Sequence, residues 1–236
     1  MGRAFEYRRA AKEKRWDKMS KVFPKLVRAI TVAVRTGGAD PELNARLRSA
    51  IMNAKALNMP KDNIDGAIKR AVGKDTANFE EICYEGKGPH GSMFMIDCAT
   101  DNTNRTIVNL RQYFSKAGGQ IVENGSLQFL FRRRAVVEFT IPEGRAADEI
   151  ELELIDHGLD ELMVNEGKAE AYGEVADFGR LAKGVEELGL EITKASLQRI
   201  PTSPMELTEE QVEQLEVLID KIEDDEDVQA VYTNIA

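Results

Sequence analysis

The 236-residue chain combines 42% hydrophobic with 31% charged residues, which is the composition of an ordinary globular protein and not of a disordered or membrane-embedded one. No apolar run approaches the roughly 20 residues that cross a bilayer, and the basic start leads into further charge instead of an apolar signal sequence. The two cysteines, Cys83 and Cys98, lie in apolar stretches and are expected to be reduced thiols of a cytoplasmic protein.

The net charge of −9 is distributed unevenly along the chain. Residues 1–75 contain 18 Lys/Arg and 8 Asp/Glu, whereas residues 76–236 contain 14 and 33, so the first segment carries +10 and the second −19. Such a contrast predicts a polyanion-binding segment joined to acidic domains. The alternative is a chance cluster of solvated helix faces.

The first segment is predicted to form a three-helix bundle that begins with a basic leader, residues 3–28. Its apolar residues recur at steps of three and four, as on one helix face: Trp16, Met19, Phe23, Leu26, Ile30 and Val34. Pro24 places a helix junction near residues 19–23, because proline is best tolerated in a first turn. A second helix is predicted to open at Asp40-Pro41 with the aspartate as cap, and a third at Pro60 with Gly73 as its stop.

From residue 76 onward the sequence predicts a mixture of strands and helices. Strands are expected at 92–99 and 127–131, with a helix at 103–117 between them. Residues 136–200 then predict the order β-α-β-β-α-β, which is the ferredoxin-like arrangement.

A last helix at 209–223 and a last strand at 228–233 would complete the sheet that residues 79–131 leave unfinished. The predicted fold class is therefore α+β and multidomain, with two ferredoxin-like domains after the helical bundle, the third domain being inserted into the second. The predicted domains are a basic helical one at 1–75, a discontinuous middle one at 76–133 and 202–236, and an inserted one at 134–201.

The leader is the predicted nucleic-acid-binding segment, because ten basic residues stand between Arg3 and Arg28 against three acidic ones. Cations at this density can replace the counterions of a phosphate backbone, and interleaved aromatic side chains can stack on exposed bases. The predicted contacts are Arg3, Arg8, Arg9, Lys12, Lys14, Arg15, Lys18, Lys21 and Lys25. The alternative is a solvated helix whose aromatic residues pack on the bundle, and core packing is the expected role of Trp16.

Two further motifs could hold an anion or a partner. The glycine-rich segment 84–91, with Tyr84 and Glu85, lacks the Gly-Lys-Ser/Thr of a phosphate loop and is expected to be a turn between two strands. Residues 100–106 open a helix, where Asp101, Asn102 and Asn104 are natural caps. The other interpretation is an anion pocket, with Arg105 beside the positive end of the helix.

Catalysis and metal binding have little support in the sequence. Its two histidines, His90 and His157, lie far apart, and no base is placed near either cysteine. The acidic run 223–227 could bind Mg²⁺, but at a helix carboxyl end it is expected to fray into water. We therefore expect no catalytic residue, no metal and no cofactor.

The ordered set of motifs resembles the YebC/PmpR family over essentially the whole chain. The matching segments are residues 18–26, 37–41, 58–64, 84–91, 100–106, 118–119 and 125–126. The resemblance implies three domains, with the third inserted into the second, and a role in gene expression. Bacterial members are described as probable DNA-binding transcriptional regulators, whereas others, including a mitochondrial translational activator, act on the ribosome. Most members begin Gly-His-Ser-Lys-Trp, but here Gly2 is followed by Arg3-Ala4-Phe5, so the early histidine and tryptophan are absent while the basic charge is retained.

These observations predict a non-catalytic nucleic-acid-binding regulator of gene expression, with DNA as the leading target. The rival hypothesis is a ribosome-associated translation factor that binds ribosomal RNA through the same basic surface. A third hypothesis, an enzyme acting between Tyr84 and Asp101–Arg105, is the least favoured. The sequence indicates no membrane partner and no small-molecule cofactor, and it leaves the oligomeric state open.

Overall fold

The computed structural model describes residues 19–73 and 78–235 of the chain, with the side chains of the first helix described from residue 22 onward. The described residues belong to two compact units. Unit 1 comprises those of Met1–Val32, Asp75–Arg132 and Arg199–Ala236, and unit 2 comprises those of Ala33–Lys74 and Arg133–Gln198. No described helix combines the length and the apolar character needed to cross a membrane.

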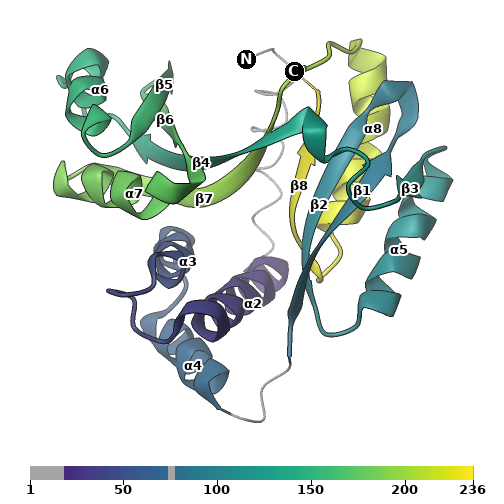
Figure 1. The fold of residues 1–236 in the computed structure, drawn as a ribbon, viewed down its shortest axis with the longest axis horizontal. Coiled ribbons are helices and arrows are strands. Elements are labelled where there is room, and N and C mark those ends of the chain that lie inside the picture. Colours follow the sequence, from purple (N-terminus) through teal and green to yellow (C-terminus); the bar gives the residue numbers. More distant parts are fainter. Residues whose placement is uncertain (1–18, 74–77, 236) are drawn as a thin grey trace. The chain divides into compact units, whose positions relative to one another are not determined.

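Three helices open the described chain, as the sequence predicts: α2 (Met19–Gly37), α3 (Ala45–Ala56) and α4 (Lys61–Val72) (Figure 1). Helix α2 runs from Met19 through Pro24 without a break, so the junction predicted near residues 19–23 is wrong for the part of the chain that the structure describes.

The predicted start of the second helix, with Asp40 as cap and Pro41 as first residue, is wrong. Helix α3 begins four residues beyond Pro41, with Asn44 as its cap. The Asn44 side chain accepts a hydrogen bond from Leu47 N and donates to the carbonyls of Ala33 and Gly38 at 2.8 Å each. One buried amide therefore satisfies the end of α2 and the beginning of α3 together, which Asp40 could not do because a carboxylate has no donor.

Unit 1 contains a four-stranded sheet in the order β3-β1-β2-β8, built from β1 (Glu80–Lys87), β2 (Met93–Thr100), β3 (Gln120–Val122) and β8 (Val228–Thr233). The antiparallel pairing of β8 with β2 confirms that the end of the chain completes the sheet begun at 79–131. The chain enters this sheet by a β1–β2 hairpin. The expected turn between two strands is confirmed for Pro89–Gly91, whereas residues 84–87 of that segment belong to β1.

One face of this sheet is covered by α5 (Thr103–Lys116) and α8 (Glu209–Glu223) (Figure 1). Phe94 of β2 and Phe114 of α5 are fully buried there and meet edge to face, with ring centroids 5.2 Å apart. Leu215 and Ile222 of α8 join the same core.

The expected strand at 127–131 is wrong. Residues Gln128–Leu130 form a 3-10 turn, and the strand of the ladder is β3, several residues earlier. The backbone donors of Gly125 and Leu127 bind the Glu85 carboxylate instead of a neighbouring strand, so this stretch cannot extend the sheet.

Unit 2 contains the second sheet, in the order β5-β6-β4-β7. Its elements confirm the predicted ferredoxin-like order: β4 (Phe131–Thr140), α6 (Ala147–Ile155), β5 (Leu159–Asn165), β6 (Lys168–Gly173), α7 (Phe178–Glu187) and β7 (Glu191–Pro201). Both helices pack on one face, where Val137, Phe139, Ile150, Leu154 and Leu181 form a closed core.

Helix α3 belongs to the same compact unit as the second sheet. The side chain of Asn53 donates to the carbonyl of Ala195 and accepts from its N–H, both at 2.8 Å, which ties α3 to β7. The division into three domains at the predicted boundaries remains a prediction.

Candidate nucleic-acid interface and adjoining polar network

The predicted nucleic-acid contacts Arg3, Arg8, Arg9, Lys12, Lys14, Arg15 and Lys18 lie outside the described residues. Lys21 lies within α2, but its side chain is not described either. Lys25 is the first of the predicted contacts whose side chain is described. Nucleic-acid binding by the leader therefore stays a prediction from its charge, and the structure describes the side chains of its last residues only.

Lys25 makes an intramolecular contact with the carboxyl end of α8. Its Nζ donates to the Glu223 carbonyl at 2.6 Å, which satisfies one of the free carbonyls at that helix end. Burial lowers the pKa of the Lys25 ammonium, although the acidic residues around the end of α8, with Glu223 first, act in the opposite direction. One donor of the predicted interface is thus already engaged within unit 1.

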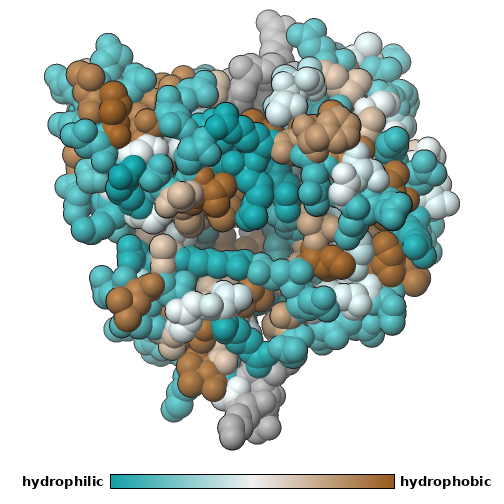
Figure 2. Space-filling model, in the orientation of Figure 1, coloured by the Kyte–Doolittle hydropathy of each residue, from teal (hydrophilic) through white to brown (hydrophobic). Residues whose placement is uncertain are grey.

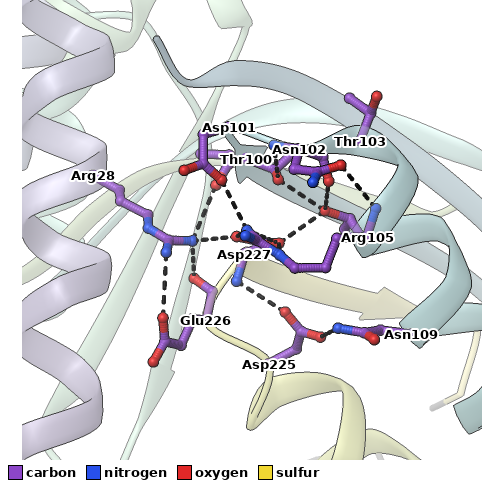
Figure 3. A network of polar contacts seen from close by, with 12 residues as sticks. Arg28, Thr100, Asp101, Asn102, Thr103, Arg105, Asn109, Asp225, Glu226 and Asp227 are labelled. Atoms are coloured by element: carbon purple, nitrogen blue, oxygen red, sulfur yellow. Dashed lines mark hydrogen bonds and ion pairs between the residues drawn. The ribbon is translucent and has the colours of Figure 1, made fainter. Parts of the chain in front are cut away.

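Arg28, one turn further along α2, binds the turn between α8 and β8 (Figure 3). Its Nη1 lies 2.6 Å from both the Glu226 carbonyl and Asp227 Oδ1, and its guanidinium stands over the Phe79 ring at 5.1 Å. The Arg28 side chain is 12% exposed and that of Asp227 is 2% exposed, so water screens this ion pair weakly. This contact attaches α2 to the turn that leads into β8, within unit 1.

Asp227 is the centre of the network shown in Figure 3. Besides Arg28, it accepts hydrogen bonds from Arg105 Nη2 at 2.8 Å to each oxygen and from Thr106 Oγ1 at 2.8 Å. Burial by itself raises the pKa of this carboxyl, but the hydrogen bonds from Arg105, Thr106 and Arg28 outweigh it and hold the pKa below its usual value. Asp227 is therefore a charged, structural acceptor.

Asp225 forms a second centre beside Asp227. Its Oδ2 accepts from Asn109 Nδ2 and from the Tyr113 hydroxyl, both at 3.0 Å, and its Oδ1 accepts from the Asp227 N–H. Burial and the nearby Asp225 carboxylate raise the pKa of Tyr113 to about 12.

The expectation that the run 223–227 frays into water is wrong for Asp225 and Asp227, which are both buried. Their partners come from α2 and α5, far away in the sequence. In the sequence, the only indication that these two aspartates are buried is their position two residues apart just before an apolar strand, and this indication is weak.

The motif 100–106 performs the capping role that the sequence favoured. Asn102 Oδ1 accepts from the Arg105 N–H at 3.1 Å and so caps α5. The Arg105 guanidinium is paired with Asp101 at 2.9 Å as well as with Asp227, and these hydrogen bonds, that with Asp227 first, raise the pKa of Arg105. Asn104 lies exposed on the first turn. The anion-pocket interpretation relies on Arg105 as its cation, but Arg105 is already paired with the carboxylates of Asp101 and Asp227.

Tyr84 and Glu85 hold loops in place and are shielded from solvent. The Tyr84 hydroxyl donates to the Thr103 carbonyl at 3.2 Å. Glu85 is fully buried, and its two oxygens accept from the N–H groups of Gly125 and Leu127 at 2.6 Å each. A carboxylate that replaces water with two backbone donors fixes the loop that supplies them.

The described residues provide little chemistry for catalysis. Burial raises the pKa of Cys83 to about 12 and raises that of Cys98 as well, so both thiols stay protonated at neutral pH. Within residues 19–73 and 78–235, no group of three or more His, Cys, Asp or Glu side chains is arranged to hold a metal ion.

Comparisons with known proteins cover nearly the whole chain. The TACO1/YebC protein N-terminal domain matches residues 3–74, and the TACO1/YebC second and third domain matches residues 79–235. A probable transcriptional regulatory protein of Wolinella succinogenes is 59% identical, and one of Helicobacter hepaticus is 60% identical, each over the full length of both chains.

A solved structure has the same fold. The crystal structure of a conserved hypothetical protein from Aquifex aeolicus aligns with a TM-score of 0.84 at 35% identity, covering 93% of this chain and 90% of that one. Domain matches, full-length relatives and fold agree with the motif order noted in the sequence. The chain belongs to the TACO1/YebC family.

Proposed function

We propose that this protein is a cytoplasmic, non-catalytic regulator of gene expression that binds nucleic acid through its basic leader, with DNA as the leading target. The charge distribution carries the proposal: residues 1–75 hold +10 and the remainder −19. A cationic segment releases the counterions of a phosphate backbone, while an acidic body keeps nonspecific contacts away from the rest of the surface. The names of the relatives, probable transcriptional regulatory proteins, support a regulatory role.

The contacts of Lys25 and Arg28 support this arrangement. Both cations bind the end of α8 and the turn after it, so the last turn of the leader is anchored to an acidic element. We therefore assign the polyanion contacts to the cations that precede Lys25 in the sequence. The predicted contacts are accordingly Arg3, Arg8, Arg9, Lys12, Lys14, Arg15, Lys18 and Lys21, with Lys25 as the point of attachment.

The second candidate is a ribosome-associated translation factor that places the same cations on ribosomal RNA. The matching domains are named after TACO1 as well as YebC. This supports the translation-factor candidate, because the family resemblance includes a mitochondrial translational activator. Phosphate contacts do not distinguish the two targets, since both present the same backbone charge.

Ribosome profiling of a deletion strain, combined with a transcript census, separates the two candidates. Loss of transcripts from a small set of promoters, with unchanged ribosome occupancy per transcript, supports a DNA target. Pausing at defined codons with unchanged transcript levels supports the ribosome. A strain that changes in neither respect would contradict both.

A further inference from the structure

The loop between β3 and β4 presents an aromatic side chain to solvent. Phe129 is 75% exposed, and among the described large hydrophobic residues only Leu43 is more exposed. A phenyl ring is one of the largest apolar groups that a chain can bury, so leaving it in water forgoes a large hydrophobic gain. An exposed aromatic residue on an ordered element is therefore a candidate binding residue.

The loop is held rigidly on the side that precedes Phe129. The fully buried Glu85 fixes Gly125 N and Leu127 N at 2.6 Å each. Ser126 closes a turn, with its N–H and hydroxyl both bound to the Glu123 carbonyl. Leu127 itself is 3% exposed.

The side that follows Phe129 is held equally well. The Leu130 carbonyl accepts from both Thr202 N at 2.9 Å and Thr202 Oγ1 at 3.2 Å. Phe131, the first residue of β4, is buried against Met95. Because the backbone is fixed on both sides, the exposure of Phe129 is a property of the folded loop.

The exposed neighbours of Phe129 along the chain are polar. Asn124, Ser126 and Gln128 carry no charge, Glu123 is acidic and Arg132 is basic. On the one face of the molecule that Figure 2 shows, hydrophobic residues lie in separate clusters among hydrophilic ones. Protein-docking surfaces have a contiguous apolar centre, whereas single aromatic rings beside amides and guanidinium groups are typical of sites that stack a base and neutralise its phosphate.

We propose that Phe129 stacks on an unpaired nucleobase. This inference rests on the proposed nucleic-acid-binding function and adds a second contact outside the leader. The ligand must be single-stranded or looped, because a base within a duplex is already stacked on both faces. Both melted DNA and RNA offer that chemistry.

Fluorescence anisotropy of the full-length protein with three labelled probes of equal length tests the proposal: single-stranded RNA, single-stranded DNA and duplex DNA. Phe129→Ala is expected to bind a single-stranded probe about tenfold more weakly, within the range found when one base–aromatic stack is removed. Phe129→Trp should retain the affinity, because the indole also stacks. Duplex binding should stay unchanged in both variants, since it depends on the leader.

Val108→Ala is the matched control, because Val108 is 61% exposed on α5 and is not aromatic. It should leave all three affinities unchanged. The single-stranded probe that loses affinity with Phe129→Ala identifies DNA or RNA as the source of the base.

Wild-type affinity of Phe129→Ala for both single strands would overturn the inference and leave the proposed function standing. Failure of the wild-type protein to bind any probe at low salt would instead overturn the proposed function, and the inference with it.

Discussion

Replacing Asp227 by asparagine removes the charge at the centre of the polar network while keeping the shape of the side chain. Asp227 is the acceptor that Arg28, Arg105 and Thr106 share. Asparagine keeps one acceptor oxygen, but its NH2 group replaces the second oxygen and would face donors such as Arg105 and Thr106. We expect the unfolding free energy of unit 1 to fall.

The size of the effect follows from the exposure of the partners. Removing one member of a buried ion pair costs about 3–5 kcal/mol, because the other charge is left uncompensated. The Arg28 side chain is 12% exposed, whereas that of Arg105 is 46% exposed and retains its ion pair with Asp101. Most of the loss in unfolding free energy therefore comes from Arg28. The lower end of the range, about 3 kcal/mol, is therefore expected.

Urea denaturation at pH 7 measures this change, with Glu226→Gln as the control. Glu226 also pairs with Arg28, at 3.4 Å, but its side chain is 80% exposed, so its loss should cost less than about 0.5 kcal/mol. Equal stabilities of Asp227→Asn and Glu226→Gln would refute the claim that burial makes Asp227 the anchor.

The stability difference between the wild-type protein and Asp227→Asn is expected to depend on pH. Because the folded-state pKa of Asp227 is lowered, its stabilising effect is complete above the unfolded value of about 3.9 and is lost as the pH falls toward the folded value. The stability difference between wild type and Asp227→Asn should therefore shrink below about pH 4. A difference that stays constant down to pH 2 would contradict the lowered pKa.

Glu85→Gln should cost about 1–3 kcal/mol, because its amide donor would face a backbone N–H, and hydrogen exchange at Leu127 should accelerate; unchanged exchange would argue against the clamp. Gly173→Ala should destabilise the second sheet by at least about 2 kcal/mol, because the new Cβ would lie 2.5 Å from the backbone oxygen of Gly158; a wild-type thermal transition would contradict this. Residues 134–201 alone should unfold cooperatively, because their core is drawn from that segment; a non-cooperative calorimetric trace would count against the domain boundaries.

Much of the fold could be predicted from local sequence signals. The β-α-β-β-α-β order of the second sheet and its helices could be predicted because each element carries its own periodicity, and the core is drawn from one continuous segment. The place of β8 beside β2 followed from the need to complete a sheet.

Two of the errors, the strand at 127–131 and the acidic run 223–227, have a common physical cause, which is a partner distant in the sequence. The apolar stretch after Gly125 resembles a strand, but Glu85, 40 residues earlier, binds its backbone donors. The aspartates at 225 and 227 resemble a solvated helix end, yet Arg28 and Asn109 bury them. Sequence patterns report on local periodicity, and none of them identifies a donor that arrives from another element.

The salt dependence of nucleic-acid binding by the full-length protein tests the central claim most directly. Affinity for duplex DNA and for ribosomal RNA should fall steeply with salt, and each duplex phosphate contact should contribute about −0.9 to the slope of log K against log salt. Replacing Arg8, Arg9 and Lys12 together by alanine should weaken binding to all sequences alike and flatten that slope by roughly two to three units. A wild-type protein that binds neither nucleic acid at low salt would contradict the account, and the basic leader would then be a solvated helix face.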